Sequence, residues 1–196
     1  MVLWYIEKIN QMKKRTELEK EFAKKLRVDL EKHFDVISAE KLIKNFVTGG
    51  NVRTDFICFI RMGTPEIERE FFMVECKKPF DKKVRLISDA FHQLSEHVHE
   101  CKYVGKKALF GLIASPEIYD GYAETKVYDY MKIITQHEAL KNLGHIKISD
   151  SGDIEFWMSK MENKKALFTP KDGFDLEQLA QKQGSKRVRT YRNESI

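Results

Sequence analysis

The 196-residue sequence has few of the features that mark membrane-spanning, secreted or disulfide-linked proteins. It contains no run of 18 apolar residues, so we expect no membrane span. Its first residues lack the basic-then-apolar layout of a secretory signal peptide. Its three cysteines, Cys58, Cys76 and Cys101, have no short spacing between them. This low number and wide spacing favour buried, reduced thiols in a cytoplasmic protein over a disulfide framework or a zinc site.

Several catalytic motifs are missing as well. The chain has no Gly-rich phosphate loop of the Walker type, because Gly49-Gly50 alone does not make one. It has no Gly-x-Ser-x-Gly motif, so acyl transfer has no support. It also has no internal repeat and no low-complexity segment. With 42% hydrophobic and 33% charged residues, the sequence fits one soluble globular domain over residues 1–196.

The positive charge is small overall but concentrated near the end of the sequence. The net charge of +5 permits nucleic-acid binding without requiring it. Residues 182–192 hold five positive and no negative charges. Such a segment either contacts phosphates or is a solvated terminus, and both interpretations stay open. We expect residues 183–196 to form a basic, flexible tail and residues 1–15 to form an N-terminal extension.

The most informative segment is a predicted antiparallel hairpin. Two apolar runs, 55–62 and 71–77, flank a Gly/Pro turn at 63–66. If the turn centres on Pro65, each residue i lies opposite residue 130 − i. Asp55 then falls opposite Glu75.

This register would bring three charged side chains to one face. Directly opposed residues share a face with Cβ atoms about 4.5–5.5 Å apart. Because strand side chains alternate, Lys77 joins Asp55 and Glu75 while Cys76 points the other way. Opposed carboxylates cost energy unless a cation lies between them. Mg²⁺ prefers one or two carboxylates with water and substrate phosphate, and Mn²⁺ suits the same oxygen ligands, so the pair predicts a divalent metal site.

The rest of the pattern predicts an α/β protein. Thr16 and Glu19 have the spacing of a capping box, followed by an apolar stripe that begins at Leu18. A short strand or helix end is expected over 42–47. The expected helices are 16–34, 84–101, 120–141 and 174–182, and the expected strands besides the hairpin are 106–114, 144–149, 153–158 and 165–168. The order is that of a mixed central sheet flanked by helices, αβββαβ.

An aspartate, a spacer and Glu-x-Lys at the end of an apolar strand resemble the motif of the PD-(D/E)XK nuclease superfamily, which includes many restriction enzymes. The matching residues are Asp55, Glu75 and Lys77; Thr54 stands where a proline often precedes the aspartate. The resemblance covers roughly residues 16–114. It implies a restriction endonuclease-like core and a metal-dependent endonuclease that hydrolyses phosphodiester bonds in DNA, duplex or branched. It also implies a homodimer, since such enzymes often cut both strands as dimers.

The resemblance assigns roles to these residues. Asp55, Glu75 and the backbone carbonyl of Cys76 would be ligands of Mg²⁺ or Mn²⁺. Lys77 would orient the water or neutralise phosphate charge. We favour electrostatic stabilisation over a general-base role, because two neighbouring carboxylates favour the charged ammonium.

A glutamate of the first helix would complete the set, as in archaeal-type Holliday junction resolvases, which the stretch 19–26 and the loop 48–55 resemble. Glu17, Glu19 and Glu21 are the candidates. Glu19 precedes the stripe residue Phe22 by three positions, so it sits on the core side of the helix. We therefore choose Glu19 as metal ligand, with half of a capping box as its alternative role.

Gln93 is the last candidate. Residues 90–94 and 75–79 resemble the nuclease domain of type I restriction motor subunits, in which a helix glutamine would position the lysine or a phosphate. A solvated helix edge is the alternative. His97 stands near the place of an aromatic in that branch, and we interpret it, with His92 and His99, as an ordinary exposed histidine, because no i, i+4 pair exists among the three.

Two other functions stay open. A non-catalytic nucleic-acid-binding or regulatory protein could use the same fold, since function must be argued from the site. The charged residues could also be a solvated strand end with no function. The sequence leaves the choice between DNA and RNA, and between duplex, junction and single strand, undecided.

Overall fold

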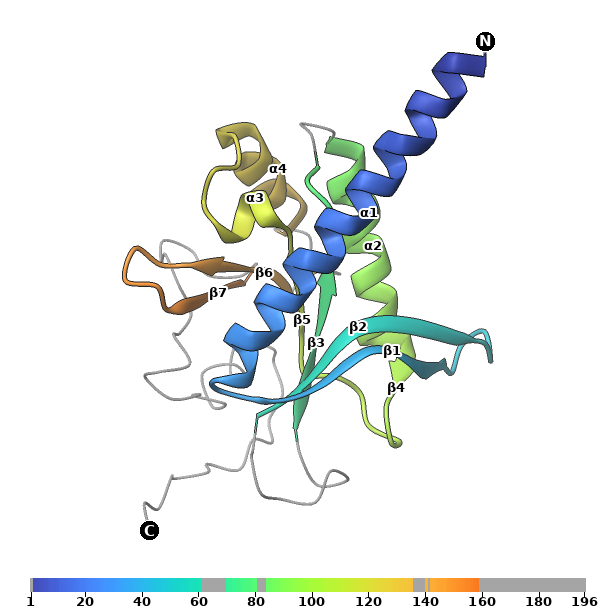
Figure 1. Cartoon of the computed structure of the whole chain (residues 1–196). Coiled ribbons are helices and arrows are strands. Elements are labelled where there is room, and N and C mark those ends of the chain that lie inside the picture. The colour runs from blue at the N-terminus through green and yellow to red at the C-terminus, as the bar shows by residue number, and fades with distance from the viewer. Residues whose placement is uncertain (1, 61–69, 81–83, 136–139, 141, 159–196) are drawn as a thin grey trace.

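The computed structural model describes residues 2–60, 70–80, 84–135, 140 and 142–158. These residues form a mixed β-sheet with helices on both faces (Figure 1). Its strands are β1 (Asp35–Asn45), β2 (Asn51–Phe59), β3 (Phe71–Cys76), β4 (Cys101–Lys102), β5 (Gly111–Ala114), β6 (Leu143–Ile148) and β7 (Ile154–Met158). The helices are α1 (Val2–Glu31), α2 (Val84–Glu100), α3 (Pro116–Tyr119) and α4 (Thr125–Thr135). The strand order in this sheet is β4-β1-β2-β3-β5-β6-β7. The chain is thus an α/β protein, as predicted.

Strand β3 lies inside the sheet. It pairs antiparallel with β2 and parallel with β5, and all six of its residues are buried. A strand covered on both faces needs apolar residues at successive positions, and the run from Phe71 to Val74 supplies them. Glu75 at the end of this run is therefore carried into a buried position.

The predicted hairpin register is confirmed. Phe56 pairs with Val74 and Cys58 with Phe72, so each pair of positions sums to 130. Asp55 and Glu75 are the residues next to the Phe56–Val74 pair, at the end of the paired segment. The predicted turn at 63–66 lies outside the described residues.

Helix α1 covers one face of the sheet. Phe22, Leu26 and Leu30, spaced four apart, pack with the side chains of β2, β3 and β5 that point to this face. The helix begins at Val2, so Thr16 lies within it and the predicted capping box is wrong. Leu18, predicted to belong to the apolar stripe, is 43% exposed because α1 extends beyond the sheet at that end.

Helix α2 covers the opposite face, with the predicted bounds almost unchanged. Ile87, Phe91 and Leu94 pack on the other side of β2, β3 and β5. Gly111 of β5 allows a close approach, since a Cβ there would lie 2.7 Å from Val98 Cγ2 and 2.8 Å from Leu94 Cγ. The glycine therefore sets how near α2 can lie to the sheet.

Other predicted elements need correction. The strand predicted over 106–114 is regular only over β5, although Leu109 and Phe110 already make backbone hydrogen bonds to β3. Its predicted start, Lys106, instead forms a bridge with Tyr103 across a tight turn. Of the helix predicted over 120–141, the structure shows α4 from Thr125, because Gly121 at φ 75° interrupts the chain before it, and residues 136–139 and 141 lie outside the described residues. The short helix α3, which ends before residue 120, was not predicted. Strand β1 is longer than 42–47, and β4 was not predicted.

Strands β6 and β7 form the predicted hairpin around Gly152, which has φ 84°. The strand and helix predicted over 165–168 and 174–182, and the basic tail, lie outside the described residues. The elements from α1 to β5 follow the predicted order αβββαβ, with the two-residue β4 added before β5. No helix within the described ranges is long and apolar enough to cross a membrane.

We expect Gly111→Ala to destabilise the protein by about 1–3 kcal/mol, because the added methyl group would overlap Leu94 and Val98. Urea denaturation would measure the change. Gly50→Ala is the matched control, since its Cβ would lie 3.5 Å from the nearest atom, an ordinary contact. Equal stability of Gly111→Ala and wild type would contradict the tight packing of α2 on β5.

Candidate functional site

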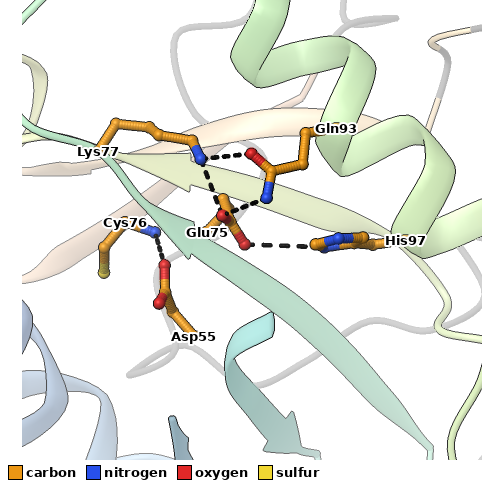
Figure 2. A network of polar contacts seen from close by, with 6 residues as sticks. All are labelled: Asp55, Glu75, Cys76, Lys77, Gln93 and His97. Atoms are coloured by element: carbon orange, nitrogen blue, oxygen red, sulfur yellow. Dashed lines mark hydrogen bonds and ion pairs between the residues drawn. The ribbon is translucent and has the colours of Figure 1, made fainter. Parts of the chain in front are cut away.

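The predicted site residues meet where β3 ends, between β2 and α2 (Figure 2). Strand β2 provides Asp55, β3 provides Glu75, and Lys77 directly follows β3. Gln93 comes from α2. Asp55 and Glu75 share the face of the sheet that α2 covers, because they alternate with Phe56 and Val74, which pack on the α1 face. The shared face of Asp55, Glu75 and Lys77 was predicted correctly.

Lys77, Glu75 and Gln93 form a closed set of hydrogen bonds. Lys77 Nζ donates to Glu75 Oε1 at 2.8 Å and to Gln93 Oε1 at 2.6 Å. Gln93 Nε2 donates to the same Glu75 Oε1 at 2.9 Å. Each side chain thus contacts the other two, which fixes the position of the ammonium group. Gln93 is half-buried and bonded to Lys77 and Glu75, so it is not a solvated helix edge, and its role in positioning the lysine for chemistry stays a prediction.

Asp55 is held by the backbone of the neighbouring strand. Its Oδ2 accepts a hydrogen bond from the Cys76 N–H at 2.8 Å. Burial and the negative charge of Glu75 raise the pKa of Asp55 to about 6, although the Cys76 N–H and the positive charge of Lys77 act in the opposite direction. The Cys76 thiol points to the α1 face and is buried there. All three cysteines are free and buried, as predicted.

The second oxygen of Glu75 has no hydrogen-bond partner among the described residues. Glu75 is 5% exposed, and its Oε2 is buried. His97 Nδ1 lies 3.7 Å away, beyond hydrogen-bond range. Burial lowers the pKa of His97, so this histidine carries no charge that could offset the carboxylate at neutral pH. A buried carboxylate oxygen without a partner is costly, and burial accordingly raises the pKa of Glu75.

Glu19 reaches the same region from α1. It is half-buried, and burial together with the negative charge of Asp55 raises its pKa, while Lys77 and Lys78 oppose that rise. Glu19 in turn raises the pKa of Glu75. These mutual effects put the predicted first-helix glutamate within electrostatic reach of both strand carboxylates.

The donor set suits a hard divalent cation that keeps water ligands. Across the described ranges, no three His, Cys, Asp or Glu side chains lie close enough to form a metal site by themselves. Mg²⁺ needs no such cluster, since it uses one or two carboxylates and completes its shell with water and phosphate oxygens. Glu75 Oε2 has no hydrogen-bond partner among the described residues, and burial and the charge of Glu75 raise the pKa of Asp55, so neither carboxylate is fully compensated for its burial by the side chains around it.

The interpretation of His97 as an exposed histidine is wrong. His97 is 2% exposed and its ring faces Glu75 (Figure 2). It lies one helical turn after Gln93, so the i, i+4 spacing from Gln93 was the signal that could have found it. His92 is exposed, as predicted.

Comparison with known proteins gives no match. No family model matches the chain, and no significantly similar protein was found among curated proteins or solved structures. The interpretation of the site therefore depends on its residues and their geometry.

We expect Asp55→Asn to stabilise the metal-free protein at pH 7.5 by about 1–3 kcal/mol. The raised pKa means that the folded state binds this proton more tightly than the unfolded state, so Asp55 costs stability as the pH rises from about 4 through about 6. Asparagine keeps an oxygen for the Cys76 N–H without the charge.

Urea denaturation in EDTA at pH 4.5 and 7.5 would test this. The stability difference between Asp55→Asn and wild type should be small at pH 4.5 and large at pH 7.5. A difference that does not change with pH would show that Asp55 titrates normally.

Proposed function

We propose that this protein is a metal-dependent endonuclease that hydrolyses phosphodiester bonds in DNA, with a restriction endonuclease-like core of the PD-(D/E)XK type. One observation carries the proposal. Two desolvated carboxylates on adjacent strands, one of them with a buried oxygen that lacks a hydrogen-bond partner among the described residues, lie beside a lysine whose ammonium group is held in place. Phosphodiester hydrolysis needs these parts: oxygen ligands for a metal and a cation near the phosphate.

Asp55, Glu75, the Cys76 carbonyl and Glu19 are the groups that would hold Mg²⁺ or Mn²⁺. When bound, the metal would supply charge stabilisation and an acidified water. Lys77 stabilises negative charge on the phosphate, because its hydrogen bonds to Glu75 and Gln93 hold the ammonium group in one orientation. Gln93 is a positioning residue that acts through Lys77.

The alternative, a non-catalytic nucleic-acid-binding or regulatory protein on the same fold, explains the site less well. Binding alone would be served by exposed lysines. It would not require Asp55 and Glu75 to be buried in positions that raise the pKa of both carboxylates. Buried charge that lowers stability is found mainly where it serves function.

The element order adds support for the fold assignment. The helix, the three antiparallel strands, the second helix and the strand parallel to β3 follow one another as the superfamily resemblance implies. The site lies at the carboxyl end of β3, next to β5, a common place for ligand sites in open α/β sheets. A homodimer that cuts both strands remains part of this proposal.

We expect metal-dependent cleavage by the wild type of at least one member of a substrate panel, with no cleavage in EDTA. The panel holds supercoiled plasmid, linear duplex, four-way junction, and single-stranded DNA and RNA, each with Mg²⁺ or Mn²⁺. Glu75→Gln and Lys77→Met should lower the rate by at least 100-fold, because they remove a ligand and the phosphate cation.

Calorimetry with Mn²⁺ should show binding to the wild type and to Lys77→Met, and much weaker binding to Glu75→Gln. Lys126→Gln, an exposed lysine of α4, is the control and should cleave normally. If no substrate is cut and Mn²⁺ does not bind, the catalytic proposal fails and the non-catalytic alternative stands.

Gln93→Leu should lower the cleavage rate by about 10–100-fold without loss of Mn²⁺ binding, because Lys77 would lose the acceptor that orients it. His92→Leu, on the adjacent, exposed position of α2, is the matched control. A purely structural role of Gln93 would instead lower thermal stability and leave the rate of the folded enzyme unchanged.

A further inference from the structure

The β1–β2 pair extends past the end of β3 as an arm. Residues Asn51 to Thr54 of β2 pair with β1, whereas the pairing of β2 with β3 starts at Phe56. The turn that joins the two strands, residues 46–50, lies at the right-hand edge of the molecule in Figure 1. Asp55 marks where β2 ceases to pair with β3, while β1 of the arm still pairs with β4 at the edge of the sheet. The arm therefore begins at the candidate site.

The tip of the arm exposes apolar side chains among lysines. Phe46 is 45% exposed and Val47 is 65% exposed. The ammonium groups of Lys102 and Lys107 lie 5.2 and 4.6 Å from the centre of the Phe46 ring. An aromatic ring on the surface with two cations beside it offers a stacking face and two phosphate-binding groups at one place.

The backbone of the tip is held by a buried side chain. Asn45 is 0% exposed, and its Oδ1 accepts hydrogen bonds from the N–H groups of Val47 and Thr48, both at 2.9 Å. Its Nδ2 donates to Glu96 at 3.0 Å and to Glu100 at 3.2 Å. These bonds fasten the turn to the end of α2, so the exposed ring is presented in a fixed position. Such preorganisation reduces the entropy lost on binding.

The lysines at the arm tip lie close enough to repel one another when no ligand is bound. Lys44 of β1 lies directly opposite Lys102 of β4, and both are exposed. Like charges in directly opposed strand positions are destabilising. Arg53, also exposed, extends the positive charge along β2 toward Asp55. An anion at the tip would relieve the repulsion.

We propose that the arm tip binds an unpaired nucleotide, whose base stacks on Phe46 while the flanking phosphates contact Lys102 and Lys107. The proposal rests on the proposed function and narrows its substrate class to nucleic acid with a single-stranded or branched segment. A base within a duplex has no free face for such stacking, whereas an unpaired base does. Phosphates would draw the two ammonium groups away from the ring, since the cation–ring contacts of exposed lysines are weak.

The distance to the site fits a single substrate. Asn51, the first residue of β2, precedes Asp55 by four residues, which is roughly 13 Å along a strand. One nucleic-acid chain can therefore contact the tip and the carboxylates at once. The arm would hold the unpaired segment, and cleavage would take place near it.

Fluorescence anisotropy in EDTA would test the proposal with labelled single-stranded DNA, single-stranded RNA, forked duplex and blunt duplex. Phe46→Ala should weaken binding to the first three by about 5–50-fold, and to blunt duplex by less than twofold. The paired substitution Lys102→Gln/Lys107→Gln should reduce the slope of log affinity against log salt by about 1.4 for single strands. Comparing single-stranded DNA with single-stranded RNA shows which of the two provides the unpaired nucleotide.

Tyr122→Ala is the matched control for Phe46. Tyr122 is an aromatic with 62% exposure, but Asp120 and Glu117 make its surroundings acidic, so its loss should not change binding. Lys32→Gln/Lys126→Gln is the charge-matched control for the paired lysines.

Three results would overturn the inference: no binding by the wild type at low salt, equal affinity of Phe46→Ala and Tyr122→Ala, or equal losses for single-stranded and blunt duplex DNA. Binding is measured without metal, so it can be judged separately from cleavage. If Phe46→Ala binds as the wild type does and metal-dependent cleavage is normal, only the proposal for the arm tip is wrong. If Phe46→Ala weakens binding but the wild type cleaves no substrate, only the nuclease proposal is wrong.

Discussion

The register between β2 and β3 is the constraint on which the site depends. A shift by one residue would turn every side chain of the moved strand to the other face of the sheet, so Asp55 and Glu75 would no longer share a surface. The apolar residues of the same strands prevent such a shift, because Phe72 and Val74 fill the α1 side and Phe71 and Met73 fill the α2 side. The hydrophobic core thus holds two carboxylates together against their repulsion. The Cys76 N–H completes this arrangement by binding Asp55 from the neighbouring strand.

The second constraint is the close packing of α2 on β5. Gly111 lets the helix approach at Leu94 and Val98. Gln93 and His97, which directly precede these two residues, thereby come close to Glu75. A larger residue at position 111 would widen the gap and lengthen the bonds of Gln93 to Lys77 and Glu75. The geometry of the polar site is therefore set by apolar contacts on the neighbouring helical positions. The same helix fastens the arm through Glu96 and Glu100, so one element connects the site to the arm tip.

The sequence was sufficient to predict the features that depend on local pattern. A turn centred on Pro65 predicted the register, strand alternation predicted the shared face of Asp55, Glu75 and Lys77, and the apolar stripe predicted α2. The start of α1 was missed, because the capping-box pattern at Thr16 occurs inside a helix that continues to Val2. His97 was missed for a different reason. Its burial depends on how α2 sits over β3, which is a tertiary fact that the spacing of the histidines does not contain. The support of the Phe46 turn by Asn45 is likewise tertiary, since its partners Glu96 and Glu100 lie more than 50 positions away.

The distribution of unfavourable charge separates the catalytic interpretation from the structural one. At a solvated strand end, Glu75 would be exposed and its pKa would be ordinary, whereas it is 5% exposed and its pKa is raised. Natural proteins keep such costs mainly at functional sites, where a ligand offsets them. Two such places lie among the described residues: the carboxylates of Asp55 on β2 and Glu75 on β3, and the opposed lysines Lys44 of β1 and Lys102 of β4. The first holds two buried carboxylates beside Lys77, and the second holds two exposed lysines near the Glu96 and Glu100 carboxylates that bind Asn45. Under the proposed function, a metal ion would offset the charge of the buried carboxylates and nucleic-acid phosphates would pair with the exposed lysines, so one substrate bound with its metal would reach both places.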